Sequence, residues 1–553
     1  MSDQLKIALA QLNPLVGDIE GNLEAARLAH AEAAAAGADL VVFSELFITG
    51  YPPEDLVLKP AFQQEAKEAL VDLAHLTSND EPAIIMGAPW LDNGALYNAA
   101  LLLADGTIEA QRYKVHLPNY GVFDELRVFA PGPMPGPINF KGIRLGVMVC
   151  EDLWFDDVPE CLQETGAEIF VVLNGSPFSV TKFDERLQHA VARVTETALP
   201  LLYVNQVGGQ DELVFDGASF ALNADGSLAA QLPSWEAVVS LSEWRRDEQG
   251  WSCTEGEKAL REEGLEAIYL ATMCGLRDYV EKNRFPGLVL GLSGGIDSAL
   301  SAAIAVDALG AERVHCLMMP SRYTAKESLK DAADCAEALG VQYDAISIED
   351  TVDAVETMMS PAFVGTTPDA TEENIQSRLR ALVLMAMSNK FGKMLLTTGN
   401  KSEVSVGYTT LYGDMCGGYN ALKDIYKTDV FALAKWRNTH LAKTARGPRG
   451  RVIPQNIIDK PPSAELRPNQ KDEDTLPPYD VLDDILKCLV ESDMSFKQVV
   501  ARGHDPDTVK RIEHLLYVAE YKRRQAPPGV KISPKNFGRD RRYPITNGFR
   551  DAR

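Results

Sequence analysis

The amino-acid sequence predicts an α/β protein built from two large domains. The chain has 553 residues, 46% of them hydrophobic, whereas a single core stops growing near about 250–300 residues. Short Val-, Ile- and Leu-rich segments alternate with helical patterns in both halves, which is typical of layered α/β domains. The pattern lapses once, in the polar segment SEWRRDEQGWSCTEGEK (242–258). We therefore expect domains at 1–245 and 263–553, joined by a linker at 246–262.

Six strand-like segments occur in the first half, and each is short and apolar. They are KIALAQLNP (6–14), ADLVVFSEL (38–46), AIIMGAPW (83–90), IRLGVMVCED (143–152), AEIFVVLNGSP (167–177) and LPLLYVNQVGG (199–209). Between the first two, GNLEAARLAHAEAAAAGA (21–38) has helical periodicity. The alternation predicts a layered α/β arrangement for this half.

The second half opens with a helical stretch, EAIYLATMCGLRDYVEKN (266–283). LVLGLSGGIDSALSAAIAVDAL (288–309) then has the form of a strand, a glycine-rich turn and a helix. Residues 441–480 are rich in Pro, Gly and charged side chains, which predicts a loop. Their first part, 441–452, is basic and contains a proline, and no role follows from its composition.

The composition excludes several classes of protein. The net charge is −25, from 54 Lys and Arg against 79 Asp and Glu, so a general affinity for nucleic acid is not expected. The eight cysteines include no C-x-x-C pair and are too sparse for a disulfide scaffold, and the eight histidines lack zinc-binding spacing. No apolar run is long enough to span a bilayer, and no signal-type segment opens the chain. We expect a cytoplasmic protein that binds neither membranes nor nucleic acid.

The segment GLSGGIDS stands between a predicted strand and a predicted helix. Its glycines let backbone amides approach an anion closely, and the Gly-Lys-Ser/Thr ending of a Walker A loop is missing. An ordinary glycine-rich turn is the alternative. The segment consists of Gly291, Leu292, Ser293, Gly294, Gly295, Ile296, Asp297 and Ser298.

This pattern resembles the pyrophosphate loop of the ATP pyrophosphatase family, which cleaves ATP between its α- and β-phosphates. The resemblance implies that the loop binds ATP and that Asp297 helps to place Mg²⁺. It also implies a Rossmann-like, doubly wound α/β domain of the adenine nucleotide alpha hydrolase type.

Glu45, Lys114 and Cys150 have the contexts FSELFITGYP, YKVHLPNYGVFDE and VCEDLW. Alone, each side chain suits a solvated surface or a core. Together, their order and contexts resemble the glutaminases of the nitrilase superfamily, which implies an αββα sandwich. The chemistry agrees, because a carboxylate can take the thiol proton, the thiolate can attack an amide, and an ammonium can stabilise the oxyanion. The resemblance adds Glu125 as the acidic residue that positions the lysine.

The same resemblance places three side chains around the glutamine head group. The Lys182 ammonium is suited to the α-carboxylate of glutamine, and the NGSP segment also suits a plain turn. The three residues are Tyr120, Ser176 and Lys182.

Several families combine such a phosphate loop with a glutaminase. Asparagine synthetases use an N-terminal cysteine exposed by removal of the initiator methionine, whereas Ser2 follows Met1 here, and GMP synthetases carry a Cys-His-Glu triad. A nitrilase-type half followed by a pyrophosphatase-type half resembles the glutamine-dependent NAD synthetase family over nearly the whole chain. The resemblance implies that ammonia from glutamine amidates deamido-NAD through an acyl adenylate, with release of AMP and pyrophosphate.

Four further segments match this family: EENIQSRLRALVLMAMSNK, LLTTGNKSEVSVGYTTLYGD, DIYKTDV and KPPSAEL. TTGNKSE also suits a plain helix N-terminus, and the basic tail EYKRRQAPPGVKISPKNFGRDRRYPITNGF also suits a solvated face. The resemblance implies that ATP is bound by Thr398, Lys427 and Ser463. It implies that deamido-NAD is bound by Asn374, Glu403, Lys522 and Lys535, and that Mg²⁺ is bound by Asp297 and Glu403.

Two other functions stay open: an amidotransferase of the same domain pairing that acts on another carboxylate, and a non-enzymatic scaffold with degenerate domains. The intact reactive residues disfavour the scaffold. The family resemblance also implies a homo-oligomer with paired synthetase domains and an enclosed passage for ammonia. The expected partners are therefore glutamine, deamido-NAD and ATP.

Overall fold

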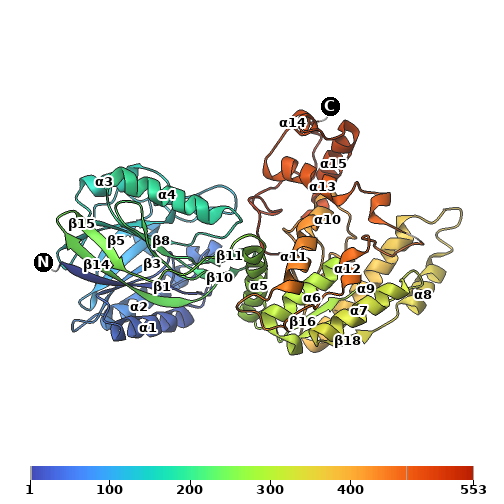
Figure 1. The fold of residues 1–553 in the computed structure, drawn as a ribbon, viewed down its shortest axis with the longest axis horizontal. Coiled ribbons are helices and arrows are strands. Elements are labelled where there is room, and N and C mark those ends of the chain that lie inside the picture. Colours follow the sequence, from blue (N-terminus) through green and yellow to red (C-terminus); the bar gives the residue numbers. More distant parts are fainter. Residues whose placement is uncertain (1–2, 469, 552–553) are drawn as a thin grey trace. The chain divides into compact units, whose positions relative to one another are not determined.

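The computed structural model describes residues 3–468 and 470–551. The chain divides into two compact units, Met1–Glu262 and Glu263–Arg553, and each is an α/β domain (Figure 1). None of the helices in the described ranges has the length and apolar content that crossing a membrane requires.

The segment predicted as a linker, 246–262, belongs in large part to the sheet of unit 1. β14 (Val238–Asp247) ends within it, and β15 (Gly250–Glu255) pairs antiparallel with β14. Trp251 and Cys253 are buried, so a period-2 apolar pattern is present among the charged residues. The linker prediction was wrong at β15 because the high charge of the segment obscured that pattern.

Unit 1 contains two large mixed sheets and a short ladder. The first sheet has the order β15-β14-β1-β2-β3-β4-β5, and the second β13-β12-β9-β8-β7-β6. The first includes β1 (Gln4–Gln11), β2 (Leu40–Val42), β3 (Ala83–Asp92), β4 (Ala95–Ala104) and β5 (Thr107–Tyr113). The second includes β6 (Ile138–Phe140), β7 (Ile143–Val149), β8 (Ile169–Asn174), β9 (Leu201–Asn205), β12 (Phe220–Leu222) and β13 (Leu228–Gln231). The ladder pairs β10 (Val207–Gln210) with β11 (Leu213–Asp216).

Three apolar clusters hold unit 1 as four layers. The central cluster joins the two sheets through residues such as Leu9, Val147 and Val171. A second packs α1 (Ile19–Ala35) and α2 (Pro60–Leu76) on the first sheet, and a third packs α3 (Asp157–Glu164) and α4 (Lys182–Thr197) on the second. Figure 1 shows the two helix pairs on opposite sides of the strands. The predicted αββα sandwich is confirmed.

Unit 2 is built on a five-stranded parallel sheet in the order β18-β17-β16-β19-β20. Its strands are β16 (Leu288–Gly291), β17 (Val314–Met318), β18 (Gln342–Ala345), β19 (Met394–Thr397) and β20 (Tyr419–Asn420). In chain order this is 3-2-1-4-5, the doubly wound arrangement, and the strand order reverses between β16 and β19. Ligands of such sheets bind at the carboxyl ends of the strands at this reversal. The predicted Rossmann-like fold is confirmed.

Twelve named helices accompany this sheet in the described part of unit 2: α5 (Gly264–Lys282), α6 (Ile296–Leu309), α7 (Lys326–Leu339), α8 (Glu349–Met359), α9 (Ala370–Phe391), α10 (Lys401–Val406), α11 (Lys427–Thr439), α12 (Gln455–Asp459), α13 (Tyr479–Leu486), α14 (Phe496–Ala501), α15 (Pro506–Val518) and α16 (Glu520–Arg523). A separate apolar cluster packs α10 with α13, α14 and α15. The region 441–480, predicted as a loop, contains α12 and the start of α13, and its residue 469 lies outside the described residues.

Candidate active sites

Glu45, Lys114 and Cys150 each follow the end of a strand in unit 1. Glu45 follows β2, Lys114 follows β5, and Cys150 begins the short 3-10 helix Cys150–Leu153 directly after β7. The Lys114 Nζ lies 2.7 Å from Glu45 Oε1, and neither side chain is exposed to solvent. Cys150 is also buried. An ammonium and a carboxylate held together without solvent form a strong charge-assisted contact.

Glu125 is the second carboxylate at this lysine. Lys114 Nζ donates to Glu125 Oε1 at 2.9 Å, and the Tyr51 hydroxyl donates to the same oxygen at 2.9 Å. Burial raises the pKa of Glu125 to about 7, although the nearby Lys114 ammonium lowers it. Burial alone would lower the Lys114 pKa, but the charges of Glu125 and Glu45 outweigh it and raise that pKa well above its ordinary value. Lys114 is therefore a cation at every physiological pH.

Two groups that the sequence analysis did not identify fix the Glu45 carboxylate. Asn98 Nδ2 donates to Glu45 Oε1 at 2.7 Å, and the Gly175 backbone N–H donates to Oε2 at 2.8 Å. A Cβ at position 175 would lie 2.7 Å from the Tyr51 ring, so only glycine permits this approach. β7 and β8 are parallel neighbours, so Cys150 and Gly175, which follow these strands, lie at the same carboxyl end of the sheet.

The backbone at Cys150 is left-handed, with φ of 48°, a conformation that is strained for a non-glycine residue. Asp152 holds this turn: its Oδ1 accepts from the amides of Val115 (2.9 Å) and His116 (2.8 Å), and its Oδ2 from that of Val149 (3.2 Å). Burial, reinforced by Glu45, raises the pKa of the Cys150 thiol well above its ordinary value. The resting sulfur is therefore protonated and needs a base to become a nucleophile.

Tyr120 and Lys182 contact residues that closely follow Cys150 in the chain. The Tyr120 hydroxyl donates to both oxygens of Glu151, at 2.8 and 3.1 Å, while its ring is half exposed. The Lys182 ammonium lies 4.0 Å from the centre of the Trp154 ring, a cation–π contact. Burial lowers the Lys182 pKa, against the raising influence of Glu185, whose Oε2 lies 3.2 Å from the ammonium. Glu151, directly after the cysteine, was not assigned from the sequence.

Ser176 is held from three sides in the loop after β8. Arg186 Nε donates to its hydroxyl at 2.9 Å and Arg186 Nη2 to its carbonyl at 2.7 Å, while the Ser176 amide donates to Asn205 Oδ1 at 2.9 Å. Arg186 is itself buried and paired with Asp216 at 2.7 Å. These contacts fix Ser176 directly after Gly175, whose amide binds Glu45.

Unit 2 has a cavity of about 330 Å³ that the loops following β16 and β19 help to line, where the strand order reverses. The wall includes eleven of the residues assigned from the sequence: Gly291, Leu292, Ser293, Gly295, Ile296, Asp297, Ser298, Thr398, Glu403, Lys427 and Ser463. Gly294 has φ of 79°, and a Cβ there would lie 2.4 Å from the Ser328 carbonyl oxygen. Glycine is therefore required for the loop to turn in front of α6.

Hydrogen bonds inside the loop fix its shape. Ser293 N donates to Ser298 Oγ at 3.2 Å, and Ser298 Oγ donates to the Gly295 carbonyl at 3.0 Å. The Gly295 amide donates to Ser293 Oγ at 3.2 Å. α6 begins at Ile296, and its first three residues line the cavity. The amides of a first helical turn have no intrahelical partner. This is a preformed anion-binding arrangement.

Lys427 joins two carboxylates at the cavity wall. Its Nζ lies 2.5 Å from Asp297 Oδ2 and 3.3 Å from Glu403 Oε1, and Asn400 Nδ2 donates to Asp297 Oδ1 at 2.8 Å. Burial raises the pKa of Glu403 to about 8, against the lowering influence of Lys427. No cluster of three or more metal-binding side chains occurs within the described ranges. Mg²⁺ commonly uses only one or two carboxylates together with substrate phosphates, so Asp297 and Glu403 fit this ion.

Four assigned residues are not part of the wall: Gly294, described above, and Asn374, Lys522 and Lys535. Asn374 Oδ1 accepts from Thr410 Oγ1 at 2.8 Å, and Lys522 Nζ donates to the carbonyls of Gly407 (2.8 Å) and Thr409 (2.6 Å). Thr409 lines the cavity, so Lys522 lies immediately behind the wall. Lys535 is different, because its ammonium pairs with Asp493, and the structure does not bring it to the cavity.

Two cations of the wall were missed in the sequence. Arg380, on α9, donates from Nε to the Met319 carbonyl at 3.0 Å, and burial lowers its pKa to about 10. Lys460 donates to Ser328 Oγ and to Asp331 Oδ2, both at 3.1 Å. Their signals were weak: Arg380 is one of several charges on a helix whose apolar and charged residues are mixed around its axis, and Lys460 precedes a double proline. With Lys427, they give the cavity three positive charges.

Known families and structures match both units. Residues 6–248 match the family described as carbon-nitrogen hydrolase, and residues 268–526 match the family described as NAD synthase. The glutamine-dependent NAD(+) synthetase of Rhodobacter capsulatus is 54% identical over 551 residues, covering 100% of both chains. That of Acinetobacter baylyi is 43% identical, covering 99% of both. The solved structure of glutamine-dependent NAD+ synthetase from Acinetobacter baumannii with ADP is 41% identical, has a TM-score of 0.78 and covers 99% of both chains. The chain therefore belongs to the glutamine-dependent NAD(+) synthetase family.

Proposed function

We propose that this chain hydrolyses glutamine in unit 1 and uses the ammonia, with ATP, to convert deamido-NAD into NAD in unit 2. One observation carries the proposal: a single chain holds both a buried Glu45–Lys114–Cys150 set and a parallel-sheet cavity with a glycine-rich anion loop. Relatives with the same two halves, aligned over their full length, are named glutamine-dependent NAD(+) synthetases.

In the amidase reaction, Cys150 is the nucleophile and Glu45 the base. The thiol proton passes to Glu45 as the sulfur bonds to the glutamine side-chain carbonyl carbon. The Lys114 ammonium stabilises the oxyanion in a site without solvent. Collapse of the intermediate returns the proton to the leaving nitrogen, so ammonia departs and a thioester remains. Glu45 then takes a proton from water as the water oxygen bonds to the thioester carbon; the C–S bond breaks, glutamate leaves, and the proton on Glu45 returns to the Cys150 sulfur.

The substrate's head group carries one negative and one positive charge, and unit 1 offers a partner for each. Lys182 suits the α-carboxylate, and Glu151, held by the Tyr120 hydroxyl, suits the α-ammonium. Ser176, fixed by Arg186, adds a polar group. Tyr120 is half exposed, which suits a residue that covers an entering ligand.

In the synthetase reaction, the loop 291–298 binds the β- and γ-phosphates of ATP through its amides and serines. The carboxylate of deamido-NAD attacks the α-phosphorus, pyrophosphate leaves, and an acyl adenylate forms. Ammonia then attacks the acyl carbon, and AMP leaves as NAD forms. Lys427 and Arg380 offset phosphate charge in the cavity. When bound at Asp297 and Glu403, Mg²⁺ would supply further positive charge to the phosphates.

The remaining substrate contacts and the assembly belong to the same proposal. Glu403 lies in the wall and Lys522 directly behind it, so both can approach deamido-NAD. Asn374 is bonded to Thr410, next to the wall residue Thr409, and is kept as a contact on the family resemblance, whereas the described position of Lys535 offers no such contact. The family resemblance further supports a homo-oligomer with paired synthetase domains. We place the enzyme in the cytoplasm, with glutamine, ATP and deamido-NAD as its ligands.

Product analysis tests the proposal. The purified chain, supplied with deamido-NAD, MgATP and glutamine, should form NAD, AMP, pyrophosphate and glutamate in equal amounts. Formation of ADP and phosphate in place of AMP and pyrophosphate would contradict the acyl-adenylate route. Glutamine hydrolysis without any amidation of deamido-NAD would point to a different acceptor carboxylate.

A further inference from the structure

α10 has two functionally different sides. On the cavity side, Asn400 caps the helix and donates to Asp297, and Glu403 contacts Lys427. The two residues between them, Lys401 and Ser402, are fully buried and directed elsewhere. The proposed mechanism gives these two side chains no part in binding substrates.

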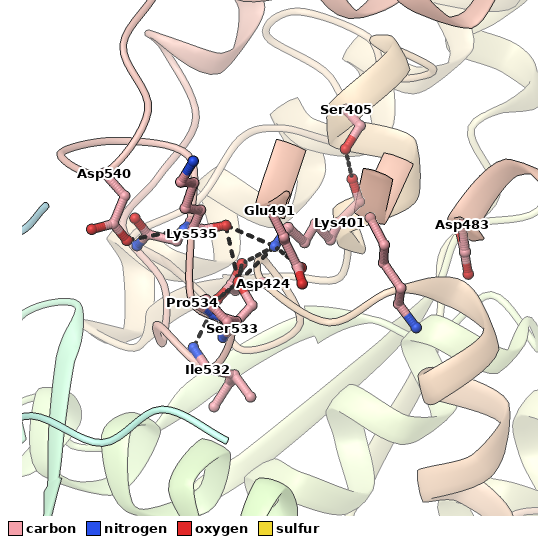
Figure 2. Close-up of polar contacts among 12 residues, drawn as sticks. Lys401, Ser405, Asp424, Asp483, Glu491, Ile532, Ser533, Pro534, Lys535 and Asp540 are labelled. Atoms are coloured by element: carbon pink, nitrogen blue, oxygen red, sulfur yellow. Dashed lines mark hydrogen bonds and ion pairs between the residues drawn. The ribbon is translucent and has the colours of Figure 1, made fainter. Parts of the chain in front are cut away.

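Lys401 is enclosed by four oxygen partners. Its Nζ lies 2.8 Å from Asp424 Oδ1 and 3.0 Å from Glu491 Oε1, and it donates to Ser533 Oγ at 2.6 Å and to the Lys535 carbonyl at 2.8 Å. Figure 2 shows these contacts converging on the end of the Lys401 side chain. One ammonium thus ties α10 to the loop after β20, to the end of the helical segment after α13, and to the C-terminal segment.

The C-terminal segment, residues 529–541, depends on this cluster for its position. Except for a single bridge between Phe537 and Arg541, it contains neither helix nor strand. Asp424 Oδ2 accepts from the backbone amides of Ile532 and Ser533, both at 2.7 Å. Polar contacts with Asp424 and Lys401 therefore replace regular secondary structure as the anchor of this segment.

Other contacts hold the rest of α10. Ser402 Oγ donates to Asp483 at 2.5 Å and accepts from the Lys427 backbone amide at 2.9 Å. Arg523 Nη1 donates to the Ser405 carbonyl at 2.7 Å, at the end of the helix where unpaired carbonyls require donors. A six-residue helix has little intrinsic stability, so its position is set by these neighbours.

We propose that Lys401 is a positioning residue of the ATP site, acting through α10 on Asn400 and Glu403. The inference rests on the proposed function of unit 2. The desolvation penalty of a buried ion pair can exceed its Coulombic gain, and such pairs are often replaceable by apolar groups without loss of stability. Stability alone therefore does not explain a lysine here. Its four fixed partners instead define one register of α10, and that register places the groups that hold Asp297 and Lys427 at the cavity wall.

The test uses the full chain with ammonia as nitrogen source, saturating deamido-NAD and varied MgATP. Lys401→Met removes the ammonium while keeping the length of the side chain. Ser533→Ala is the mild variant, because it removes one partner and leaves both carboxylates paired. Arg437→Met is the matched control: Arg437 is equally buried and paired with Asp307, near the end of α11, and its other hydrogen bonds go to the carbonyls of Pro448 and Gly450.

We expect Lys401→Met to raise the KM for MgATP about tenfold or more and Ser533→Ala about threefold, the latter with a melting temperature near the parental value. Arg437→Met should lower the melting temperature while its KM stays within about twofold of the parent. An unchanged KM in Lys401→Met, or an equal rise in Arg437→Met, would overturn the inference. If Lys401→Met does not fold, an unchanged KM in Ser533→Ala overturns it. A parental chain that makes no NAD would instead refute the proposed function.

Discussion

Replacing Glu125 by Gln is expected to change the pH dependence of glutamine hydrolysis. Burial raises the pKa of Glu125 to about 7, with Lys114 opposing the rise and Glu45 adding to it. As the pH falls through 7, Glu125 therefore gains a proton, and Lys114 retains only Glu45 as a charged partner. The glutamine side chain introduced at position 125 is uncharged at every pH and has the shape of the protonated carboxyl group. Its one oxygen can still accept hydrogen bonds from Lys114 and Tyr51.

The same titration affects the stability of unit 1. The folded-state pKa of about 7 lies above the ordinary value of 4.5, so the folded chain binds more protons between these values. The free energy of unfolding therefore falls as the pH rises through this window. At about 1.4 kcal/mol per pKa unit, the full effect is about 3 kcal/mol. Above pH 7, Glu125→Gln should therefore have a free energy of unfolding about 3 kcal/mol higher than that of the parent. Below about pH 4 the two free energies should be nearly equal.

Activity should change in the opposite direction. Losing a charge-assisted hydrogen bond to Lys114, worth about 1.5–3 kcal/mol, should lower kcat for glutamine about 10- to 100-fold above pH 7. Rates and unfolding of unit 1 should be measured from pH 5 to 9, and the inflection near pH 7 should disappear in the variant. Glu151→Gln is the control, since Glu151 contacts Tyr120 and not Lys114, and it should keep the inflection. An inflection that persists in Glu125→Gln would refute this reasoning.

Three further substitutions test separate parts of the account. Gly294→Ala should lower ammonia-dependent NAD formation about tenfold or more, because a Cβ would lie 2.4 Å from the Ser328 carbonyl oxygen; full activity would contradict the loop geometry. Asp297→Asn removes a carboxylate charge beside Lys427 and should raise the Mg²⁺ concentration for half-maximal NAD formation about tenfold or more. Glutamine hydrolysis should persist in this variant. An unaltered Mg²⁺ titration would contradict the metal-binding role of Asp297. Asp152→Ala leaves three backbone amides, one buried and two part-buried, without an acceptor and should lower the free energy of unfolding of unit 1 by about 3 kcal/mol. Asp152→Asn retains Oδ1 as an acceptor, so its free energy of unfolding, measured in urea, should fall less than that of Asp152→Ala. An equal fall in the two variants would contradict the role given to the Asp152 hydrogen bonds.

The fold was largely predictable because apolar periodicity and glycine placement act locally. The strand-like segments at 38–46, 143–152 and 288–291 each contain a strand of the structure. β15 was missed because its buried Trp251 and Cys253 lie among charged residues. An edge strand needs only one buried face, so its pattern is weak in a short, polar segment.

The reactive residues were predictable from local motifs, whereas the groups that orient them were not. Glu45 lies at the end of a predicted strand and Lys114 was identified from its motif, and the structure brings the two side chains to 2.7 Å. Asn98 and Gly175 reach the same carboxylate from β4 and the loop after β8, and no local pattern marks such long-range partners. Lys535 shows the converse, because its position in a basic tail suggested a ligand contact, yet its ammonium pairs with Asp493.

Cys150→Ala tests the central claim that one chain couples an amidase to an ATP-dependent synthetase. The substitution removes the proposed nucleophile and leaves unit 2 unaltered. NAD formation should be measured with MgATP and deamido-NAD, supplying either glutamine or a high concentration of ammonia. We expect glutamine-dependent synthesis to fall by about three orders of magnitude or more, while ammonia-dependent synthesis stays near the parental rate. Undiminished synthesis with glutamine would contradict the account.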